Sequence, residues 1–242
     1  MNRKFFFPIV VALVLAAAFL SCNKDNGNND GNNVKLLHFE LDHYGNNTRY
    51  EYDTQNRLTK ITGYSSNGGT TPYRTQTLMY GGNNLIKFDD YTLTAHSANQ
   101  LTYSDGRSTH TFELNSDSTL AKVLSSYANG WISEINYQYQ NGNLTKKTDE
   151  LLNGESHRVS TSEYTYDNMH SPFLNCKTPK WWMIWQISGS KNNATELVVY
   201  ENGEVFKLIF SYEYDNEGYP ARSFFGELRT YYSYDKWPGR KI

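Results

Sequence analysis

The sequence predicts an all-β protein: an antiparallel sheet of repeated hairpins, strongly curved into an open roll or half-barrel. Three observations support this fold class. Short runs of alternating apolar and polar residues begin at Val34, turn-forming pairs separate these runs, and a Tyr-x-Tyr motif recurs along the chain. Alternation with a period of two is typical of half-buried strands, and no long window shows the 3.6-residue periodicity of a helix. We therefore expect one β domain over residues 34–242.

The turns are marked by Asn-Gly or Asp-Gly pairs. These residues readily adopt the positive φ angles of the type I′ turns that join twisted strands in hairpins. Six such pairs separate the apolar runs: Asn67-Gly68, Asp105-Gly106, Asn129-Gly130, Asn141-Gly142, Asn153-Gly154 and Asn202-Gly203.

The Tyr-x-Tyr motif accounts for 10 of the 20 tyrosines. A spacing of two places both rings on one face of a strand, where they can contact neighbouring strands. In four of the five copies an Asp follows, and we expect its side chain to begin a turn by accepting backbone amides two residues on. The copies are Tyr50/Tyr52, Tyr137/Tyr139, Tyr164/Tyr166, Tyr212/Tyr214 and Tyr232/Tyr234, with Asp53, Asp167, Asp215 and Asp235 following.

A second repeated element has two apolar residues three positions apart with Lys at the third position. Because side chains alternate along a strand, this spacing requires either a β-bulge or a sheet that buries apolar groups on both faces. Both alternatives favour a strongly curved sheet. The copies are Leu58–Ile61, Leu85–Phe88, Leu120–Val123 and Val205–Leu208.

The N-terminus predicts export and lipid anchoring. Asn2-Arg3-Lys4 precedes an uncharged apolar run from Phe5 to Leu20, which is the layout of a secretory signal and is short for a membrane-spanning helix. Phe19-Leu20-Ser21-Cys22 resembles a bacterial lipobox. We therefore interpret residues 1–21 as a lipoprotein signal peptide and Cys22 as the lipidated residue, the alternative being an ordinary signal peptide that contains a cysteine.

Residues 23–33 contain no apolar side chain and are expected to form a flexible tether of roughly 18 Å reach. Residues 22–33 would thus link the domain to its membrane partner, and we expect an outer-membrane location. With Cys22 lipidated, Cys176 has no partner for an intramolecular disulfide and is expected to be a half-buried small residue.

The repeats resemble a known sequence pattern. The stretch from Tyr50 to Ile61, with Tyr-Asp, a turn and Arg-Leu, resembles the YD repeat of RHS-type proteins, with Asn56 where Gly is usual. Together with the lipobox, the segments 164–173 and 212–220 look like uncharacterised lipoproteins of gut Bacteroidetes with degenerate repeats of this kind. The resemblance implies a cell-envelope location and a YD-like β sheet, and it implies no activity.

No catalytic constellation is evident. The six histidines are scattered without metal-ligand spacing, so we expect no metal site and no cofactor. Loss of Arg3 and Lys4 with the signal peptide leaves 21 basic against 25 acidic residues, a net charge of −4 that gives no indication of nucleic-acid binding. The carboxylate pairs Glu51/Asp53 and Glu213/Asp215 are expected to belong to a solvated face opposite the tyrosines.

Trp181-Trp182-Met183-Ile184-Trp185 is the one unusual local feature. As a strand, this segment would place Trp181 and Trp185 on one face and Trp182 on the other, buried as core or as a plug across a rolled sheet. The alternative is an aromatic platform formed by Trp181, Trp182 and Trp185 on which a glycan ring stacks.

The sequence therefore predicts a cell-envelope lipoprotein that serves as a non-catalytic binding or scaffold module for a glycan or an envelope protein. The alternative is a polysaccharide-active hydrolase or lyase whose paired carboxylates the sequence does not reveal.

Overall fold

The computed structural model describes residues 34–235 except 67–70, 155 and 188. The predicted signal peptide, Cys22 and the tether lie outside the described residues. The chain forms seventeen strands and one helix, α1 (Lys180–Gln186), between β12 and β13. The strands are β1 (Phe39–Asp42), β2 (Asn47–Tyr52), β3 (Leu58–Tyr64), β4 (Arg74–Gly81), β5 (Asn84–Phe88), β6 (Tyr91–His96), β7 (Gln100–Ser104), β8 (Ser108–Leu114), β9 (Leu120–Tyr127), β10 (Ile132–Gln140), β11 (Asn143–Asn153), β12 (Ser156–Tyr166), β13 (Ala194–Glu201), β14 (Glu204–Ile209), β15 (Ser211–Tyr214), β16 (Pro220–Phe225) and β17 (Leu228–Ser233).

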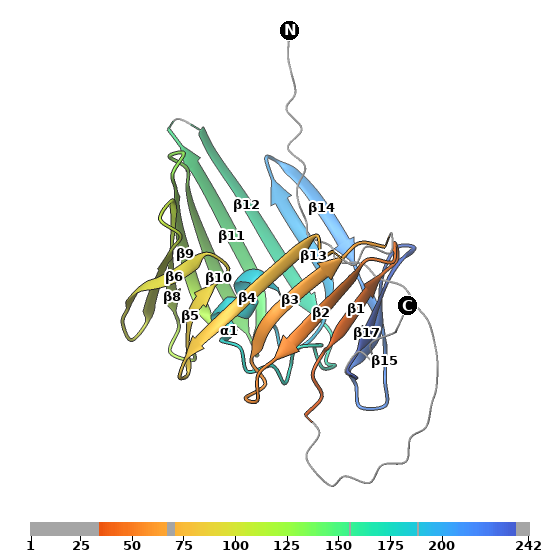
Figure 1. Cartoon of the computed structure of the whole chain (residues 1–242). Helices are drawn as coiled ribbons and strands as arrows, with labels where there is room; N and C mark the ends of the chain where they lie inside the picture. Colours follow the sequence, from red (N-terminus) through yellow and green to blue (C-terminus); the bar gives the residue numbers. More distant parts are fainter. Residues whose placement is uncertain (1–33, 67–70, 155, 188, 236–242) are drawn as a thin grey trace.

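Successive strands pair antiparallel to form one sheet nearly closed into a barrel (Figure 1). Only Phe210 separates β14 from β15, and its amide donates to the carbonyl of Thr195 on β13 at 2.9 Å, so the ladder with β13 continues past the end of β14 and the chain does not reverse. Counted as one bent strand, they leave an even number of strands, which allows the ring to close antiparallel. β1 accordingly pairs with both β2 and β17, Phe39 lying opposite Ser233. The predicted all-β, strongly curved hairpin sheet is confirmed, and it closes further than a half-barrel.

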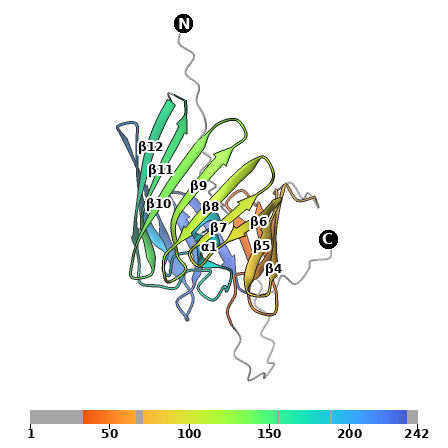
Figure 2. The ribbon, with the colours of Figure 1, turned by 90° about the vertical axis from the view of Figure 1, so that its left-hand side faces the viewer.

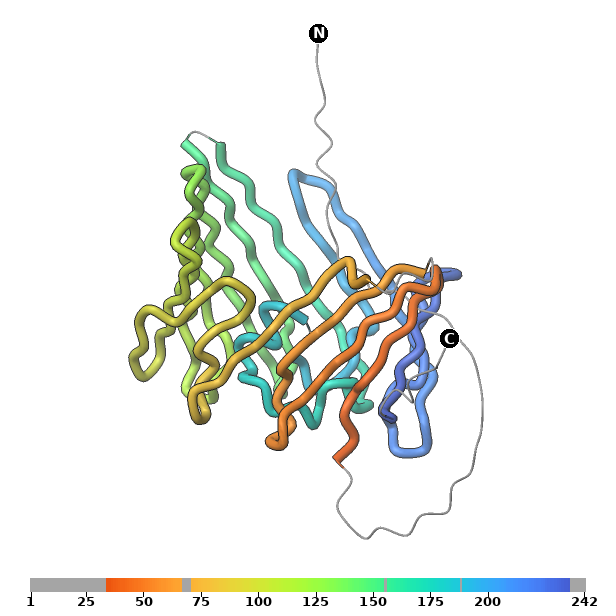
Figure 3. The backbone as a smooth tube through the Cα atoms, in the orientation of Figure 1, coloured from red at the N-terminus to blue at the C-terminus, as the bar shows by residue number. Residues whose placement is uncertain are grey.

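The barrel wall is uneven in height. β11 and β12 each have 11 residues, whereas β1 and β15 each have four. Figure 2 shows the long strands as one tall wall, and Figure 3 shows the shorter wall of β1 to β4 opposite it. One end of the barrel contains the segment 167–193, which includes α1 and is here called the plug.

Tyrosines, most of them from the Tyr-x-Tyr copies, build the inner face near the plug. In six places a tyrosine hydroxyl donates to a backbone carbonyl at or near the start of another strand. The pairs are Tyr52–Leu37, Tyr80–Leu58, Tyr103–Leu85, Tyr139–Leu120, Tyr212–Ala194 and Tyr234–Pro220. Three of the four predicted aspartate turns are present: Asp53 accepts the Gln55 and Arg57 amides, Asp167 accepts that of Met169, and Asp215 accepts those of Glu217 and Tyr219. The residues after Asp235 lie outside the described part of the chain.

Bulges account for three of the four apolar pairs that are three residues apart. Glu51 pairs with Lys60 while Tyr52 pairs with Leu58, so Thr59 is the extra residue. Both Leu58 and Ile61 are therefore buried in the core. Ile86 and Ala121 are the extra residues in the other two bulges. The fourth pair has no bulge, and Val205 consequently lies outside, 61% exposed.

The prediction of a strand across Trp181–Trp185 is wrong, because this segment is α1. The carbonyl of Pro179 accepts the amides of Trp182 and Met183 and so begins the helix. In a helix, residues four apart share a face, and Trp181 and Trp185 both contact Phe112, with ring centroids 4.5 and 4.9 Å away. The expected burial is confirmed, since Trp182 is 0% exposed and Trp181 belongs to the core.

The outer face is charged and solvated, and Glu51 and Glu213 lie on it as the sequence predicts. The prediction is wrong for Asp53 and Asp215, which are half-buried at turns, where they pair with Arg57 and Lys35. Ion pairs join adjacent strands on this face: Glu51–Lys60, Lys122–Glu134, Lys146–Glu163, Glu196–Lys207 and Glu213–Arg222. Within the described part of the chain, no helix has the length and apolar character needed to cross a membrane.

Candidate functional site

A cavity of about 280 Å³, here called the chamber, lies inside the barrel between the plug and the shorter wall. Strands β1 to β4, with β15 and β17, supply its wall, and the plug with the start of β13 supplies its floor. The lining residues are Glu40, Thr48, Tyr50, Ile61, Gly63, Tyr73, Arg74, Gln76, Ser171, Pro172, Phe173, Gln186, Ile187, Asn192, Asn193, Ala194, Tyr212 and Tyr232.

Backbone and side-chain hydrogen bonds fix the floor. The Ser171 amide donates to the carbonyl of Lys191 at 3.1 Å, so the two ends of the plug lie side by side. Asn193 donates through its backbone amide to Asp167 Oδ1 at 3.1 Å and through Nδ2 to the carbonyl of His170 at 2.9 Å. These bonds hold Ser171 and Asn193 together although 22 positions separate them in the chain.

Two oxygen atoms of the floor have no hydrogen-bond partner among the described residues: Ser171 Oγ and Asn193 Oδ1. Their residues are only 2% and 4% exposed. A buried polar atom without a partner costs roughly 1–3 kcal/mol, and native proteins contain few of them. Both residues line the chamber, although the two oxygen atoms themselves have almost no accessible surface.

Glu40 provides an acidic group in the wall. Tyr50 donates its hydroxyl to Glu40 Oε2 at 2.9 Å. Burial raises the pKa of Glu40 to about 7, although the Tyr50 hydrogen bond acts in the opposite direction. Burial also raises the pKa values of Tyr50 and Tyr232, so both phenols are neutral. Glu40 can therefore act near neutral pH either as a hydrogen-bond donor or as an acceptor.

The rim of the chamber presents an exposed aromatic ring. Tyr73 is 60% exposed, and its ring lies against Gly63, where an added Cβ would approach Tyr73 Cζ to 2.7 Å. Glycine at this position thus leaves room for the ring. Deeper in the chamber, Gln76 Nε2 donates to Gln186 Oε1 of α1 at 3.3 Å and links wall to floor.

The chamber offers hydrogen bonding and aromatic contact rather than paired acid–base chemistry. Glu40 is the one carboxyl group among the described residues that line it. Glycoside hydrolysis normally uses two carboxyl groups flanking the scissile bond. Across the described ranges, no group of three or more His, Cys, Asp or Glu side chains is arranged to hold a metal ion.

The structure does not bring the predicted glycan-stacking tryptophans together as an exposed platform. Trp181 and Trp182 are buried, and Trp185 is packed 5.1 Å from His110 and 5.5 Å from Phe88. Cys176 is half-buried, as predicted, and burial raises the pKa of its thiol. The lipidation site Cys22 lies outside the described residues.

The sequence interpretation missed Glu40, Ser171 and Asn193, which come from distant segments. One signal was available for the plug: residues 167–193 contain Pro172 and Pro179 and lack the alternation of the strands on either side. That break marks an insertion between two strands of the sheet, but it does not identify which side chains face a cavity.

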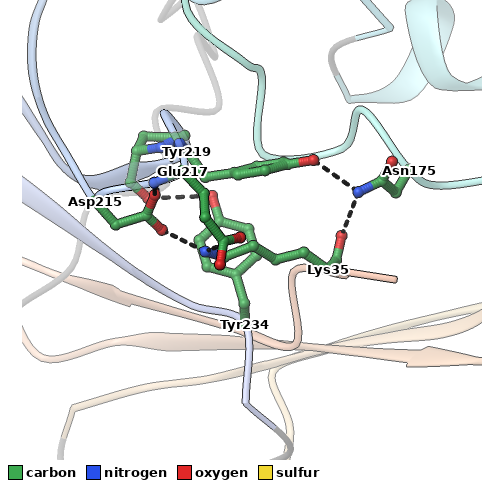
Figure 4. A network of polar contacts seen from close by, with 7 residues as sticks. Lys35, Asn175, Asp215, Glu217, Tyr219 and Tyr234 are labelled. Carbon is green, nitrogen blue, oxygen red and sulfur yellow. Dashed lines mark hydrogen bonds and ion pairs between the residues drawn. The ribbon is translucent and has the colours of Figure 1, made fainter. Parts of the chain in front are cut away.

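A second polar cluster fixes the point where the chain enters the domain (Figure 4). Lys35 Nζ forms ion pairs with Asp215 at 2.6 Å and Glu217 at 2.9 Å and lies over the ring of Tyr219. The Lys35 carbonyl accepts a hydrogen bond from Asn175 of the plug at 3.0 Å. The chain therefore enters the barrel at its plugged end.

No protein-family model matches the chain, and no curated protein does. Among solved structures, the chain is similar to a porin-like protein from Bacteroides uniformis, with a TM-score of 0.52 and 17% sequence identity. The similarity covers 84% of this chain and 97% of that chain. At this level of identity, the likeness shows a shared fold alone.

Proposed function

We propose that this protein is a non-catalytic binding module of the cell envelope, anchored to the outer membrane through a lipid on Cys22, with the chamber as its binding site. The observation that carries the proposal is the chamber itself: an interior cavity lined by polar side chains, among them Glu40, Arg74 and Gln76, together with aromatic rings. Concave sites with a few convergent polar groups are the usual location of small-molecule binding.

The plug favours binding over conduction. The neighbour from Bacteroides uniformis is called porin-like, which suggests a pore as a second candidate function. In this chain, however, the plug is held to the barrel by many contacts, including the 2.7 Å hydrogen bond from the Leu58 amide to Thr178 Oγ1. A cavity whose floor is formed by the plug suits retention of a ligand better than its passage.

The outer face supports an aqueous surrounding for the barrel. A Lys or Arg on the lipid face of a membrane barrel costs up to about 2–4 kcal/mol at mid-depth. The cross-strand ion pairs described above place such groups on many strands of the outer face. A tethered domain outside the bilayer fits this face, and the tyrosine repeats fit the resemblance to envelope lipoproteins.

The entry point of the chain supports an orientation for the tethered domain. Because Lys35 is held at the plugged end, a tether that precedes it would attach there. The opposite end, with the tall wall and the chamber rim, would then face away from the membrane, where ligands approach.

The location is tested by replacing Cys22 in the full-length protein, expressed in a bacterium with an outer membrane and supplied with an alkyne-tagged fatty acid. We expect the wild-type protein to take up the label and to sediment with outer membranes, and Cys22→Ala to do neither. Cys176→Ala is the matched control and should behave as wild type. Label uptake that survives Cys22→Ala would refute the anchor.

The binding role is tested by titrating the purified protein with oligosaccharide fragments of envelope and dietary polysaccharides. We expect saturable binding with no new reducing ends in the recovered oligosaccharide. Release of shorter products, lost in Glu40→Gln, would instead establish the hydrolase or lyase alternative. Failure of every fragment to bind, together with capture of an envelope protein through the outer face, would favour a protein-binding scaffold.

A further inference from the structure

The charged residues of the chamber restrict the chemistry of its ligand; this inference rests on the proposed binding function and deepens it. One row of residues crosses four strands of the wall. Glu40 lies opposite Thr48, Thr48 lies opposite Gly63, and Gly63 lies opposite Arg74. All four residues line the chamber. Because neighbouring strands lie about 4.8 Å apart, roughly 14 Å separates the Cα atoms of the acidic and basic residues at the two ends of the row.

Arg74 directs its side chain into the barrel. Side chains alternate along a strand, and Gln76 and Leu78, two and four positions further along β4, are both buried on the inner face. Unlike them, Arg74 is exposed, so a ligand in the chamber can reach its side chain. Within the described part of the chain, no carboxylate pairs with Arg74, and Glu40 accepts a hydrogen bond from Tyr50 instead.

The tall wall shows how this barrel neutralises another inward arginine. Arg158 shares the inner face of β12 with the buried Ser162, and it forms an ion pair with Glu201 of the adjacent strand β13. Arg74 has no such partner among the described residues and is the one Lys or Arg in the described lining. A guanidinium group matches a carboxylate in a bidentate pair, so the chamber favours a ligand that supplies the missing negative charge.

An aromatic ring lies beside this arginine. The ring of Tyr73 lies over Gly63, where an added Cβ would approach Tyr73 Cζ to 2.7 Å, and it therefore occupies the row between Thr48 and Arg74. Tyr73 is 60% exposed, so part of its ring is available to a ligand. Such a ring provides an apolar face with a polar tip, which suits a ring-shaped molecule that carries hydroxyl groups.

The size and the charge balance of the chamber limit the ligand further. Its volume of about 280 Å³ corresponds to about nine water volumes, which is enough for one hexose-sized ring. One guanidinium balances one negative charge, whereas a phosphate dianion would bring a second charge that no described lining residue neutralises. Burial raises the pKa of Glu40 to about 7, so near neutral pH this carboxyl is in part protonated and repels a bound anion less.

We propose that the chamber binds a small sugar acid, whose carboxylate pairs with the Arg74 guanidinium and whose ring packs against Tyr73. Arg74 is the most informative residue to test. Its side chain has no hydrogen-bond or ion-pair partner in the described protein, so Arg74→Gln removes a ligand contact without removing a bond of the fold.

The test is calorimetric titration of the full-length protein with D-glucuronate and D-galacturonate. D-glucose and D-galactose are the uncharged counterparts, and D-glucose 6-phosphate is the dianionic probe. We expect at least one uronate to bind saturably and at least about tenfold more tightly than its uncharged counterpart and the phosphate. Arg74→Gln should weaken uronate binding about tenfold to a hundredfold, the loss of a charge-assisted hydrogen bond, and should leave the unfolding midpoint unchanged.

The matched control is Arg229→Gln, which removes the same charge from the outside of the barrel. Arg229 is also exposed, but its neighbour Thr230 is buried on the inner face of β17, so Arg229 points outward. This variant should keep the uronate affinity of the wild type. An equal loss of affinity in both variants would show a general effect of net charge and would overturn the assignment of Arg74.

The remaining outcomes separate this inference from the proposed function. Equal or tighter binding of an uncharged sugar, or of the phosphate, would overturn the ligand class and leave the binding function intact. Failure of both uronates to bind would overturn the inference even if longer oligosaccharides bind the protein. Failure of the oligosaccharides as well would contradict the proposed glycan-binding function itself.

Discussion

Glu40 makes the stability of the protein depend on pH. Its pKa is raised from 4.5 to about 7 in the folded state, so the folded protein retains a proton that the unfolded chain has already lost at intermediate pH. A raised carboxyl pKa therefore costs no stability below pH 4.5. The stability falls as pH rises from about 4.5 to 7 and then levels off, with a total loss of about 3 kcal/mol.

Replacement of this carboxyl by an amide should remove that dependence. Glu40→Gln keeps an acceptor for the Tyr50 hydroxyl. We expect the free energy of unfolding of the variant to exceed that of wild type by up to about 3 kcal/mol at pH 8 and by little at pH 4. Urea titrations of both proteins across this range measure the difference directly. A difference that does not vary with pH would show that Glu40 titrates normally.

The repeated tyrosine hydroxyls should each contribute separately to stability. Tyr139 donates to the carbonyl of Leu120 at 2.7 Å, and Leu120 is fully buried. Tyr139→Phe keeps the ring and leaves that carbonyl without this donor, so we expect a loss of about 1 kcal/mol in the free energy of unfolding. Tyr44→Phe, at an exposed position, is the control and should change it by less than about 0.5 kcal/mol. Equal effects of the two substitutions would argue against a structural role for the hydroxyl.

At the scale of elements, one of the contacts that hold the plug in the barrel is a hydrogen bond between Thr178 and Leu58. The bulge at Thr59 displaces the Leu58 amide from the strand ladder, and Thr178 Oγ1 accepts it at 2.7 Å. Thr178→Val keeps the side-chain shape and leaves a buried amide without this acceptor, so we expect a loss of about 1–3 kcal/mol. Faster hydrogen exchange at Leu58, measured by mass spectrometry, would locate the loss at the plug.

Thr94→Val is the matched control for the plug. Thr94 Oγ1 donates to the carbonyl of Thr102 at 3.2 Å in an exposed position, so its removal should cost less than about 0.5 kcal/mol. If the two variants were equally stable, the contact between Thr178 and Leu58 would not hold the plug in place.

The sequence predicts an element well when residues close together in the chain determine it, and poorly when distant segments determine it. Turns, inward tyrosines and bulges follow from spacing within a few residues. The spacing of Leu58 and Ile61 leaves two alternatives, a bulge or apolar burial on both faces, and the structure shows the bulge. α1 is too short to show helical periodicity, and its aromatic residues also favour strands. Its helical conformation depends on packing inside the barrel, and the barrel is formed by other segments of the chain.

The chamber is less predictable for the same reason. Glu40 belongs to β1, Ser171 to the plug, and Asn193 directly precedes β13, so only the closed sheet brings them together. Their chemical roles depend on burial, which raises the pKa of Glu40 and isolates the serine and asparagine oxygens. Local sequence patterns do not predict that these polar side chains become buried.

At the scale of the whole molecule, closure of the ring places both ends of the described chain together. Lys35 Nζ lies 5.3 Å from the ring centroid of Tyr234. Adjacent termini are the condition under which circular permutation succeeds. We expect a permutant that joins residues 34 and 235 by a short Gly/Ser linker, with new termini in the turn at Gly154, to fold with its chamber intact.

Far-ultraviolet circular dichroism and the sugar titration would check the permutant. A second permutant opened within β8, at Phe112 in the core, is the control and should fail to fold. If the permutant opened at Gly154 also failed to fold, the pairing of β1 with β17 in the native barrel would be contradicted.

The β1–β17 seam also has a kinetic consequence. Phe39 reaches its partner Ser233 only after nearly the whole domain has been made, because the two residues come from opposite ends of it. Contacts of such sequence separation form late and slow folding. If the chain is exported, as proposed, its sheet stays open, with unpaired strand edges and exposed apolar surface, until the last hairpin forms. We therefore expect periplasmic chaperones that shield such edges to increase the yield of folded protein.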